Sequence, residues 1–407
     1  MNCRHCQAPL ALDFLNLGHA PPSNAYLDPA ALNAPEKTYP LRVKVCRVCR
    51  LVQTEDYAGA EELFSSDYAY FSSTSRGWLD HASRYAKMIS DRLGLDSESL
   101  VIEVASNDGY LLRNFVEAGV PCLGIEPTDS TAEAAEALGI PVVREFFGES
   151  LGECLVKEGK AADLVCGNNV YAHVPDINDF TRGLGTVLKP GGVITLEFPH
   201  LLRLVEQTQF DTIYHEHFSY LSLLAVSRIF EAAGLRIFDL EHLPTHGGSL
   251  RIYGCHADAS FDTTPAVAAA IDAERTAGLE TDEYYTAFQE RAEIVKNDLL
   301  RFLLRANAEG KSVAAYGAAA KGNTLLNFAG VKGDLLPFVC DAAKAKQGKF
   351  MPGSHIPILS PEALDTDRPD YILILPWNIA EEVKTQLSHL AEKGSRFVTA
   401  VPELKIT

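Results

Sequence analysis

The sequence contains no run of about 20 apolar residues, which is the length that a membrane-spanning helix needs. It also lacks the charged start and apolar stretch of a signal peptide, because it begins MNCRHCQAPL. Positive charge is in deficit, with 36 Lys and Arg against 54 Asp and Glu, a net charge of −18. No basic stripe offsets this balance, and a phosphate backbone would be repelled. We therefore expect a cytoplasmic protein with neither nucleic acid nor a membrane as partner.

The composition is that of an ordinary globular chain with a large core. Apolar residues make up 47% of its 407 residues and charged residues 22%. At roughly 150 residues per domain, this length predicts about three modules. No repeat of solenoid period and no low-complexity segment is present. Changes in composition and periodicity along the chain predict domains at 1–65, 66–262 and 311–407, with a helical linker at 263–310.

Apolar segments alternate with helical patterns over most of the chain, which predicts an α/β fold. In the central region the strands are expected at 100–106, 121–127, 162–169, 192–199, 235–243 and 249–256. A turn at 246–248 makes the last two an antiparallel hairpin. In the last region we expect strands at 312–317, 335–341, 371–377 and 395–401. The first 60 residues are rich in proline and show little regular periodicity.

Four of the nine cysteines form two C-x-x-C pairs near the start, namely Cys3, Cys6, Cys46 and Cys49. Zinc prefers four tetrahedral ligands, and each C-x-x-C turn offers two thiolates. We expect all four to hold one structural Zn²⁺ with no open coordination position. Unrelated buried cysteines or a redox pair are less favoured alternatives, and His5 or His19 could replace one thiolate.

The first central strand ends in the turn Glu103-Val104-Ala105-Ser106-Asn107-Asp108-Gly109. A dinucleotide site needs G-x-G-x-x-G, but Ala105 and Asn107 occupy the first two glycine positions. The acids Glu103 and Asp108 would repel phosphate and suit a cationic ligand with an amino-acid end, such as S-adenosyl-L-methionine. Glu126, which ends the next strand, is placed to accept hydrogen bonds from ribose hydroxyls.

We therefore predict a class I methyltransferase domain, with a plain strand–turn–helix junction as the alternative. The expected cofactor-binding residues lie in the turn and at the ends of two further strands: Glu103, Ala105, Ser106, Asn107, Asp108, Gly109, Glu126, Pro127, Asn168 and Asn169.

A run of ionisable and aromatic residues follows the expected strand at 192–199, with Tyr214, His215, Glu216 and His217 at its centre. Methylation of a carbon requires a carbanion, and a sugar carbon is acidic only beside a carbonyl. That chemistry needs a base with a pKa near 7 and donors for the enolate oxygen. His173 could face the same pocket. The alternatives are polar residues that cap a following helix, or a metal site, although adjacent side chains point in divergent directions.

Together these features resemble the three-domain nucleotide-sugar C-methyltransferases of deoxysugar biosynthesis. The resemblance spans the whole chain and depends most on Y-H-E-H at 214–217 and on YGAAAKGNTLL at 316–326. It implies an N-terminal zinc-binding module, a central methyltransferase domain with a Rossmann-like fold, and a C-terminal Rossmann-like domain. It also implies a dTDP- or GDP-linked keto-deoxysugar as substrate. Ala105 departs from the glycine that methyltransferases often carry there.

The resemblance also assigns residues to roles. It implies that His217 is the catalytic base, with Tyr214, Glu216, His173 and Tyr68 as further catalytic residues. The expected substrate-binding residues are Tyr70, Tyr316, Lys321 and Asn323.

The C-terminal region supports a binding role on physical grounds. Lys321 and the free N–H groups of a helix start form a seat for a diphosphate, and Asp341 ends the following strand. The G-x-x-x-K-G spacing matches neither a P-loop nor a dinucleotide fingerprint. A structural cap without a ligand is the alternative.

We expect a monomer or weak dimer that binds the nucleotide sugar between its central and C-terminal modules. Two other functions compete with carbon methylation: transfer of the methyl group to oxygen or nitrogen of a small molecule, and a non-catalytic, zinc-stapled assembly protein.

Overall fold

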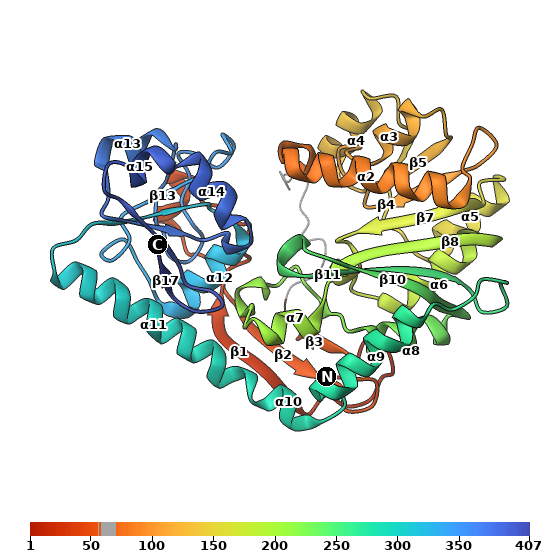
Figure 1. Ribbon diagram of the computed structural model, residues 1–407, viewed down its shortest axis with the longest axis horizontal. Helices are drawn as coiled ribbons and strands as arrows, with labels where there is room; N and C mark the ends of the chain where they lie inside the picture. The colour runs from red at the N-terminus through yellow and green to blue at the C-terminus, as the bar shows by residue number, and fades with distance from the viewer. Residues whose placement is uncertain (56, 58–70) are drawn as a thin grey trace.

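The computed structural model describes residues 1–55, 57 and 71–407. Three sheets form its framework, and Figure 1 shows the central and C-terminal sheets on opposite sides of the molecule. The N-terminal strands and a long helix run along the lower side between them. In the described part of the chain, no helix has the length and apolar character needed to cross a membrane.

The N-terminal module contains an antiparallel sheet that the sequence pattern did not predict. Its strands are β1 (Leu12–Ala20), β2 (Tyr39–Val45), β3 (Val52–Thr54) and β9 (Ser219–Tyr220). The sequence of this region shows little regular periodicity, so its strands could not be placed in advance. The inward residues of β1 alternate only imperfectly, because register shifts interrupt its pairing with β2. The fourth strand comes from the distant segment that follows Y-H-E-H, so this sheet holds that segment in place.

The central sheet has seven strands in the order β10-β11-β8-β7-β4-β5-β6. The pairings are parallel except for those that β11 makes with its two neighbours. The strands are β4 (Val101–Val104), β5 (Cys122–Ile125), β6 (Val142–Val143), β7 (Ala162–Asn168), β8 (Leu188–Pro199), β10 (Leu235–Leu243) and β11 (Ser249–His256). The predicted central strands and the hairpin are confirmed.

Helices cover the central sheet: α2 (Arg76–Leu93), α3 (Leu112–Glu117), α4 (Asp129–Glu136), α5 (Glu149–Lys157), α6 (Ile177–Val187), α7 (Leu201–Glu206) and α8 (Leu223–Ala232). Strand β4 lies where the strand order reverses, between β5 and β7. In open α/β sheets, ligands bind at the carboxyl ends of the strands at such a point.

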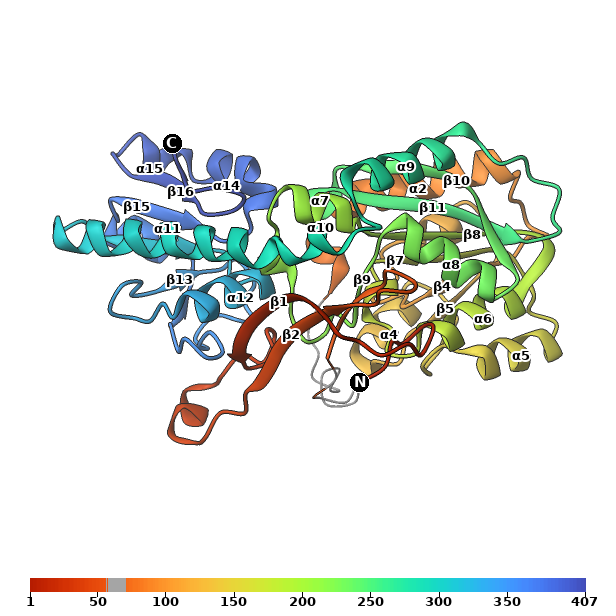
Figure 2. The same ribbon diagram turned by 90° about the horizontal axis from the view of Figure 1, so that it is seen from below.

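The linker forms α9 (Pro265–Ala277), α10 (Asp282–Thr286) and α11 (Phe288–Ala308). Figure 2 shows α11 running from the N-terminal strands to the C-terminal module. The rings of Phe14 and Phe288 stack at a centroid distance of 4.6 Å. One apolar core joins β1, α11 and the C-terminal sheet, so the linker is part of the packed structure rather than a tether.

The C-terminal sheet has the order β14-β13-β12-β15-β16-β17, and its pairings are parallel except between β16 and β17. Its strands are β12 (Val313–Tyr316), β13 (Val339–Cys340), β14 (Ile358–Leu359), β15 (Tyr371–Ile374), β16 (Arg396–Thr399) and β17 (Lys405–Ile406). Its helices are α12 (Ala320–Ala329), α13 (Glu362–Asp367), α14 (Ala380–Gln386) and α15 (Ser388–Ala391). It is a Rossmann-like α/β unit.

Six short 3-10 helices complete the described elements: η1 (Pro29–Asn33), η2 (Ser72–Thr74), η3 (Tyr171–His173), η4 (Phe210–Thr212), η5 (Thr245–Gly247) and η6 (Trp377–Ile379).

Candidate functional site

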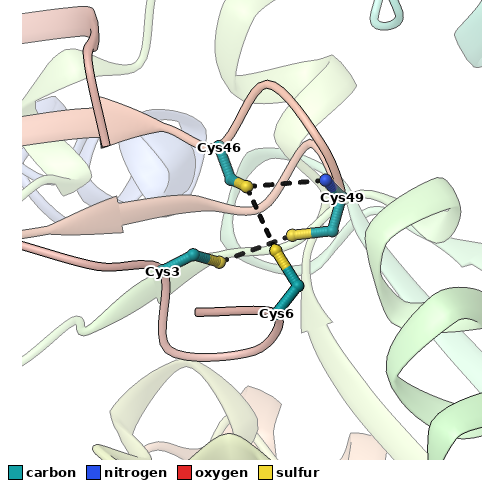
Figure 3. A group of neighbouring side chains, drawn as sticks. All are labelled: Cys3, Cys6, Cys46 and Cys49. Atoms are coloured by element: carbon teal, nitrogen blue, oxygen red, sulfur yellow. Dashed lines mark hydrogen bonds between the residues drawn. The ribbon is translucent and has the colours of Figure 1, made fainter. Parts of the chain in front are cut away.

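The two C-x-x-C pairs meet in one cluster (Figure 3). The Sγ atoms of Cys3 and Cys49 are 3.4 Å apart, as are those of Cys6 and Cys46, and all four lie within 4.8 Å of one another. Four thiolates in this arrangement match the ligand set of a structural zinc site, with no position left for a substrate. The cluster is therefore consistent with zinc binding, as expected from the spacing.

The turn after β4 is built from backbone conformations that few residues adopt. Ala105, Asn107 and Gly109 have φ angles of 58°, 49° and 77°. A Cβ atom on Gly109 would lie 2.5 Å from Cδ1 of Ile140, so glycine is required there on steric grounds as well. The turn carries the chain from β4 towards α3 and places buried polar side chains, among them Ser106 and Asp108, at the carboxyl edge of the sheet.

Two buried carboxylates flank this turn. Glu126, at the end of β5, accepts hydrogen bonds from the backbone N–H of Asn107 at 3.0 Å and of Thr128 at 2.9 Å. Glu103 is fully buried, and the Tyr110 side chain is the described hydrogen-bonding group that favours its charged form. Burial raises the pKa of Glu103 well above its ordinary value, and the negative charges of Glu126 and Asp108 add to this effect. A cationic ligand would offset both contributions.

Further buried polar atoms near this edge have no hydrogen-bond partner within the described part of the chain: Ser106 Oγ, Asp108 Oδ1, both amide atoms of Asn168, and Asn169 Oδ1. Buried polar groups in native proteins are nearly always satisfied, so such a cluster points to a ligand. S-adenosylmethionine carries an ammonium group, a carboxylate and ribose hydroxyls that could satisfy them. The chemistry of these polar groups is compatible with the cofactor, and the assignment of the individual residues, Ala105 and Pro127 among them, stays a prediction.

His217 is buried in the loop between η4 and β9. Its Nδ1 atom lies 2.9 Å from the carbonyl oxygen of Thr212. Because a carbonyl oxygen only accepts, Nδ1 carries the proton and Nε2 keeps the lone pair. Burial lowers the pKa of His217 well below its ordinary value, and the positive charge of a protonated His173 would lower it further. The imidazole is therefore neutral at pH 7.

Two of the other predicted catalytic residues surround that ring. The ring of Tyr214 lies 4.0 Å from the ring of His217, and the ring of His173 lies 4.6 Å from it, centroid to centroid. Nδ1 of His173 lies 2.8 Å from the carbonyl oxygen of Glu216, and burial lowers the pKa of His173 to about 4. The structure thus brings Tyr214, His173 and His217 together.

The two residues between Tyr214 and His217 point elsewhere. His215 Nε2 lies 3.3 Å from the carbonyl oxygen of Pro40 in β2. Glu216 Oε1 accepts a hydrogen bond of 3.2 Å from Asn24 Nδ2, and burial raises the pKa of Glu216. These divergent directions leave His215, Glu216 and His217 unsuited to hold one metal ion.

The predicted substrate-binding residues of the C-terminal module each hydrogen-bond to a different part of the protein. Lys321 begins α12 and donates a 2.6 Å hydrogen bond to Asn378 Oδ1, beside the Trp377 ring. Asn323 is buried and donates to the carbonyl oxygen of Ser23 at 2.6 Å. Tyr316 donates to Gln386 Oε1 at 3.2 Å.

A carboxylate lies close to the place where an anion is expected to bind. Asp341 accepts a 2.7 Å hydrogen bond from the backbone N–H of Ala318, so this carboxylate already occupies part of the expected anion seat. Tyr68 and Tyr70 lie outside the described residues.

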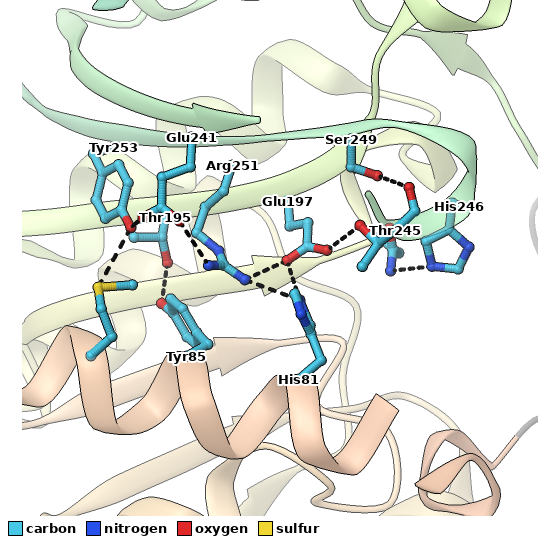
Figure 4. A network of polar contacts seen from close by, with 12 residues as sticks. His81, Tyr85, Thr195, Glu197, Glu241, Thr245, His246, Ser249, Arg251 and Tyr253 are labelled. Atoms are coloured by element: carbon cyan, nitrogen blue, oxygen red, sulfur yellow. Dashed lines mark hydrogen bonds and ion pairs between the residues drawn. The ribbon is translucent and has the colours of Figure 1, made fainter. Parts of the chain in front are cut away.

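A polar network at the cofactor edge was missed by sequence reasoning (Figure 4). Glu197 in β8 accepts from Arg251 at 2.6 Å and from Thr245 at 2.9 Å, and lies 2.9 Å from Nε2 of His81 in α2. Next to it, His246 Nε2 lies 3.1 Å from the amide nitrogen of Asn169. An acid inside the apolar segment GVITLEFP was the one available signal, because His81 and His246 carry no local pattern.

A second missed contact joins the central and C-terminal modules. The indole N–H of Trp377 donates to Asp211 Oδ2 at 2.7 Å, and Asp211 is fully buried. Nothing in the local sequence of either residue indicates this pairing, because 166 residues separate them.

Three family models match consecutive parts of the chain. A "Putative zinc binding domain" matches residues 3–64, a "Methyltransferase domain" matches 78–240, and a "C-methyltransferase C-terminal domain" matches 244–402. Together they span all three modules.

The chain is similar to one curated protein over its full length and to others over part of it. The chain is 35% identical over 404 residues to "C-methyltransferase NovU" from Streptomyces niveus, which covers 99% of this chain and 96% of the relative. It is 31% identical over 99 residues to an uncharacterized methyltransferase of Mycobacterium leprae, over 24% of this chain and 36% of that protein. The solved structure of the YcgJ protein from Bacillus subtilis covers 44% of this chain and 100% of its own, at 13% identity and a TM-score of 0.35.

One assignment follows from the full-length similarity and the family models, and the cofactor edge of the central sheet agrees with it. It excludes a non-catalytic assembly protein. It also favours carbon over oxygen or nitrogen as the methylated atom. The chain belongs to the family of S-adenosylmethionine-dependent C-methyltransferases that carry an N-terminal zinc-binding domain and a C-terminal C-methyltransferase domain.

Proposed function

We propose that this enzyme methylates the carbon beside the ketone of a dTDP- or GDP-linked keto-deoxysugar, with His217 as the base. The observation that carries the proposal is the hydrogen bond between His217 Nδ1 and the Thr212 carbonyl oxygen. It directs the lone pair of the ring to Nε2, and burial keeps the ring neutral. A neutral imidazole whose tautomer is fixed by its second nitrogen is the form that a general base requires.

The proton balance follows from the substrate class. His217 Nε2 takes the proton from the carbon next to the ketone, which we expect to be carbon 3 of a 4-keto sugar. The electron pair of that C–H bond moves into the carbonyl group and gives an enolate. Bound S-adenosylmethionine supplies an electrophilic methyl group on its sulfonium. The enolate carbon would form the new C–C bond to that methyl group as its bond to sulfur breaks, which would leave S-adenosylhomocysteine, and His217 would later return its proton to solvent.

Neighbouring groups stabilise the two charges that form, the negative charge of the enolate and the positive charge of protonated His217. Tyr214 lies against the His217 ring and is a candidate to donate to the enolate oxygen. His173 also lies against that ring and remains a predicted catalytic residue, but its Nδ1–H faces the Glu216 carbonyl oxygen, so its Nε2 atom can only accept. Each well-placed donor of this kind is worth roughly 3 kcal/mol of barrier. Negative charge on the enolate would raise the pKa of His217 in the transition state and so strengthen it as a base. Glu216, held by Asn24, and Tyr68 remain predicted catalytic residues.

The C-terminal module is the proposed binding face for the nucleotide diphosphate. Lys321 supplies a positive charge at the first turn of α12, where backbone N–H groups favour an anion. Burial lowers the pKa of Lys321, and a diphosphate would favour its charged form. Tyr316, Asn323 and Tyr70 remain predicted substrate-binding residues.

The base assignment is tested with His217→Asn. We expect turnover of a dTDP- or GDP-linked 4-keto sugar to be abolished, together with exchange of the substrate proton for solvent deuterium. S-adenosylmethionine affinity, measured by calorimetry, should stay within a few fold. His215→Asn is the matched control, because that ring faces Pro40 instead. Near-normal exchange in His217→Asn would remove this residue as the base.

The nucleotide is identified separately by thermal-shift measurements with dTDP, GDP, UDP and CDP. The preferred nucleotide should raise the unfolding temperature most, because binding to the native state stabilises it. Equal, negligible shifts with all four would contradict a nucleotide-linked substrate.

A further inference from the structure

We propose that Thr324 and Trp377 of the C-terminal module are positioning residues for His217, which they act on through the η4 segment. This inference rests on the proposed function of His217 and extends it, because it gives the C-terminal module a role in proton abstraction beyond nucleotide binding.

The η4 segment carries the hydrogen-bond acceptor for His217. This short helix ends at Thr212, whose carbonyl oxygen sets the tautomer of His217. The next carbonyl, that of Ile213, accepts a 2.9 Å hydrogen bond from Thr324 Oγ1 in α12. Consecutive carbonyls therefore bind the catalytic ring and a helix of another module. A shift of η4 relative to α12 would move the acceptor of His217 with it.

Trp377 holds the same segment from the other side. Its indole N–H donates to Asp211 Oδ2 at 2.7 Å, within η4 itself. Asp211 is fully buried, and its Oδ1 has no hydrogen-bond partner in the part of the chain that the structure describes. Burial raises the pKa of Asp211 to about 6, although the charge of Lys321 opposes this. Among the described side chains, the indole N–H of Trp377 is the group that donates a hydrogen bond to the Asp211 carboxylate.

The fit around the indole is close. A Cβ atom on Gly247, in the β10–β11 connection, would lie 2.5 Å from Cη2 of Trp377. Gly247 also accepts a hydrogen bond of 2.7 Å from Gln209 Nε2, directly before η4. The indole is therefore wedged between η4 and the hairpin, and its N–H has a defined direction.

Catalytic groups must be held to within about half an ångström by the residues behind them. Docking of modules alone would need only apolar contact, which Phe210 and Phe328 already provide at a ring distance of 5.5 Å. The Phe210 ring belongs to the same η4 segment, but apolar contact has no preferred direction, whereas the two hydrogen bonds fix the Asp211 carboxylate and the Ile213 carbonyl on either side of the acceptor for His217. This placement is what a positioning role requires.

The decisive variants are Thr324→Val, which removes the hydroxyl donor at nearly constant volume, and Thr324→Ser, which keeps it. Trp377→Phe independently removes the indole N–H. With a dTDP- or GDP-linked 4-keto sugar, we expect Thr324→Val and Trp377→Phe to lower kcat and deuterium exchange about tenfold with KM nearly unchanged. Thr324→Ser should restore most of the rate. Normal rates in both deficient variants, or an effect confined to KM, would overturn the inference.

A measurement without substrate separates this inference from the base assignment. In the full-length enzyme labelled with ¹⁵N-histidine and bound to S-adenosylhomocysteine, the His217 signal is identified by its loss in His217→Asn. We expect a single Nδ1–H tautomer in the wild type and in Thr324→Ser, and a mixture of tautomers in Thr324→Val and Trp377→Phe. An unchanged tautomer would refute the positioning role even if His217 is the base. If His217→Asn keeps its activity, the base assignment fails whatever the tautomers show.

Discussion

Glu197 and Arg251 form a buried ion pair at 2.6 Å between neighbouring strands of the central sheet, and His81 contacts Glu197 from α2, which lies below these strands in Figure 4. The side chain of Glu197 is fully buried and that of Arg251 is 3% exposed. The pair ties β8, β11 and α2 together beside the predicted cofactor edge. Burial alone would raise the pKa of Glu197, but the hydrogen bond to His81 and the charge of Arg251 hold it below its ordinary value.

Breaking this pair should destabilise the protein strongly. Arg251→Met leaves Glu197 buried without its cation, which typically costs about 3–5 kcal/mol. We expect a fall of several degrees in the unfolding temperature, measured by calorimetry. Arg113→Met is the matched control, because Arg113 makes an exposed pair with Glu117 at 3.7 Å that should contribute under about 1 kcal/mol. Equal effects of the two variants would show that the buried pair contributes no more than a surface pair.

Zinc should be bound at one equivalent and should stabilise the N-terminal module. Cys49→Ser removes one of four thiolates, and we expect metal analysis to find less than half an equivalent in that variant. Cys154→Ser is the control, since Cys154 is exposed and lies outside the cluster. A zinc content below half an equivalent in the wild type would refute the zinc assignment.

S-adenosylmethionine affinity should fall as the pH falls. Burial raises the pKa of Glu103, so this carboxylate takes up its proton at a higher pH than an ordinary Glu and then no longer attracts the cationic cofactor. Calorimetric titrations from about pH 8 to about pH 5 should show progressive weakening. In Glu103→Gln the affinity should be low and nearly independent of pH. If the affinity of Glu103→Gln falls with pH as steeply as that of the wild type, Glu103 is not the source of the pH dependence.

The left-handed turn after β4 offers a test of local strain. Ala105 has a φ of 58°, a conformation that costs a residue with a Cβ atom roughly 1 kcal/mol. Ala105→Gly should therefore stabilise the protein by up to about 1 kcal/mol, and Ala105→Val should destabilise it. Both changes are read from the unfolding temperature of the cofactor-free protein. A lower unfolding temperature in Ala105→Gly would show that the alanine methyl group makes a packing contribution larger than the strain.

Sequence alone was sufficient where the chemistry is local. The spacing within each C-x-x-C pair determines that its two thiols can share a metal, and apolar segments indicate the central strands, because both depend on residues a few positions apart. The meeting of the two pairs, Cys6 with Cys46 across 40 residues, depends on the tertiary structure. It was insufficient for the N-terminal sheet, whose fourth strand is Ser219–Tyr220 from far along the chain.

Tertiary structure decided which side chains of the site face one another. The pattern Y-H-E-H places two histidines two positions apart without distinguishing them, and only packing turns His217 towards His173 and His215 towards Pro40. The contacts of Trp377 with Asp211 and of His81 with Glu197 join residues more than 100 positions apart. No local pattern encodes such pairs, because their energy comes from burial that exists only after the modules have packed.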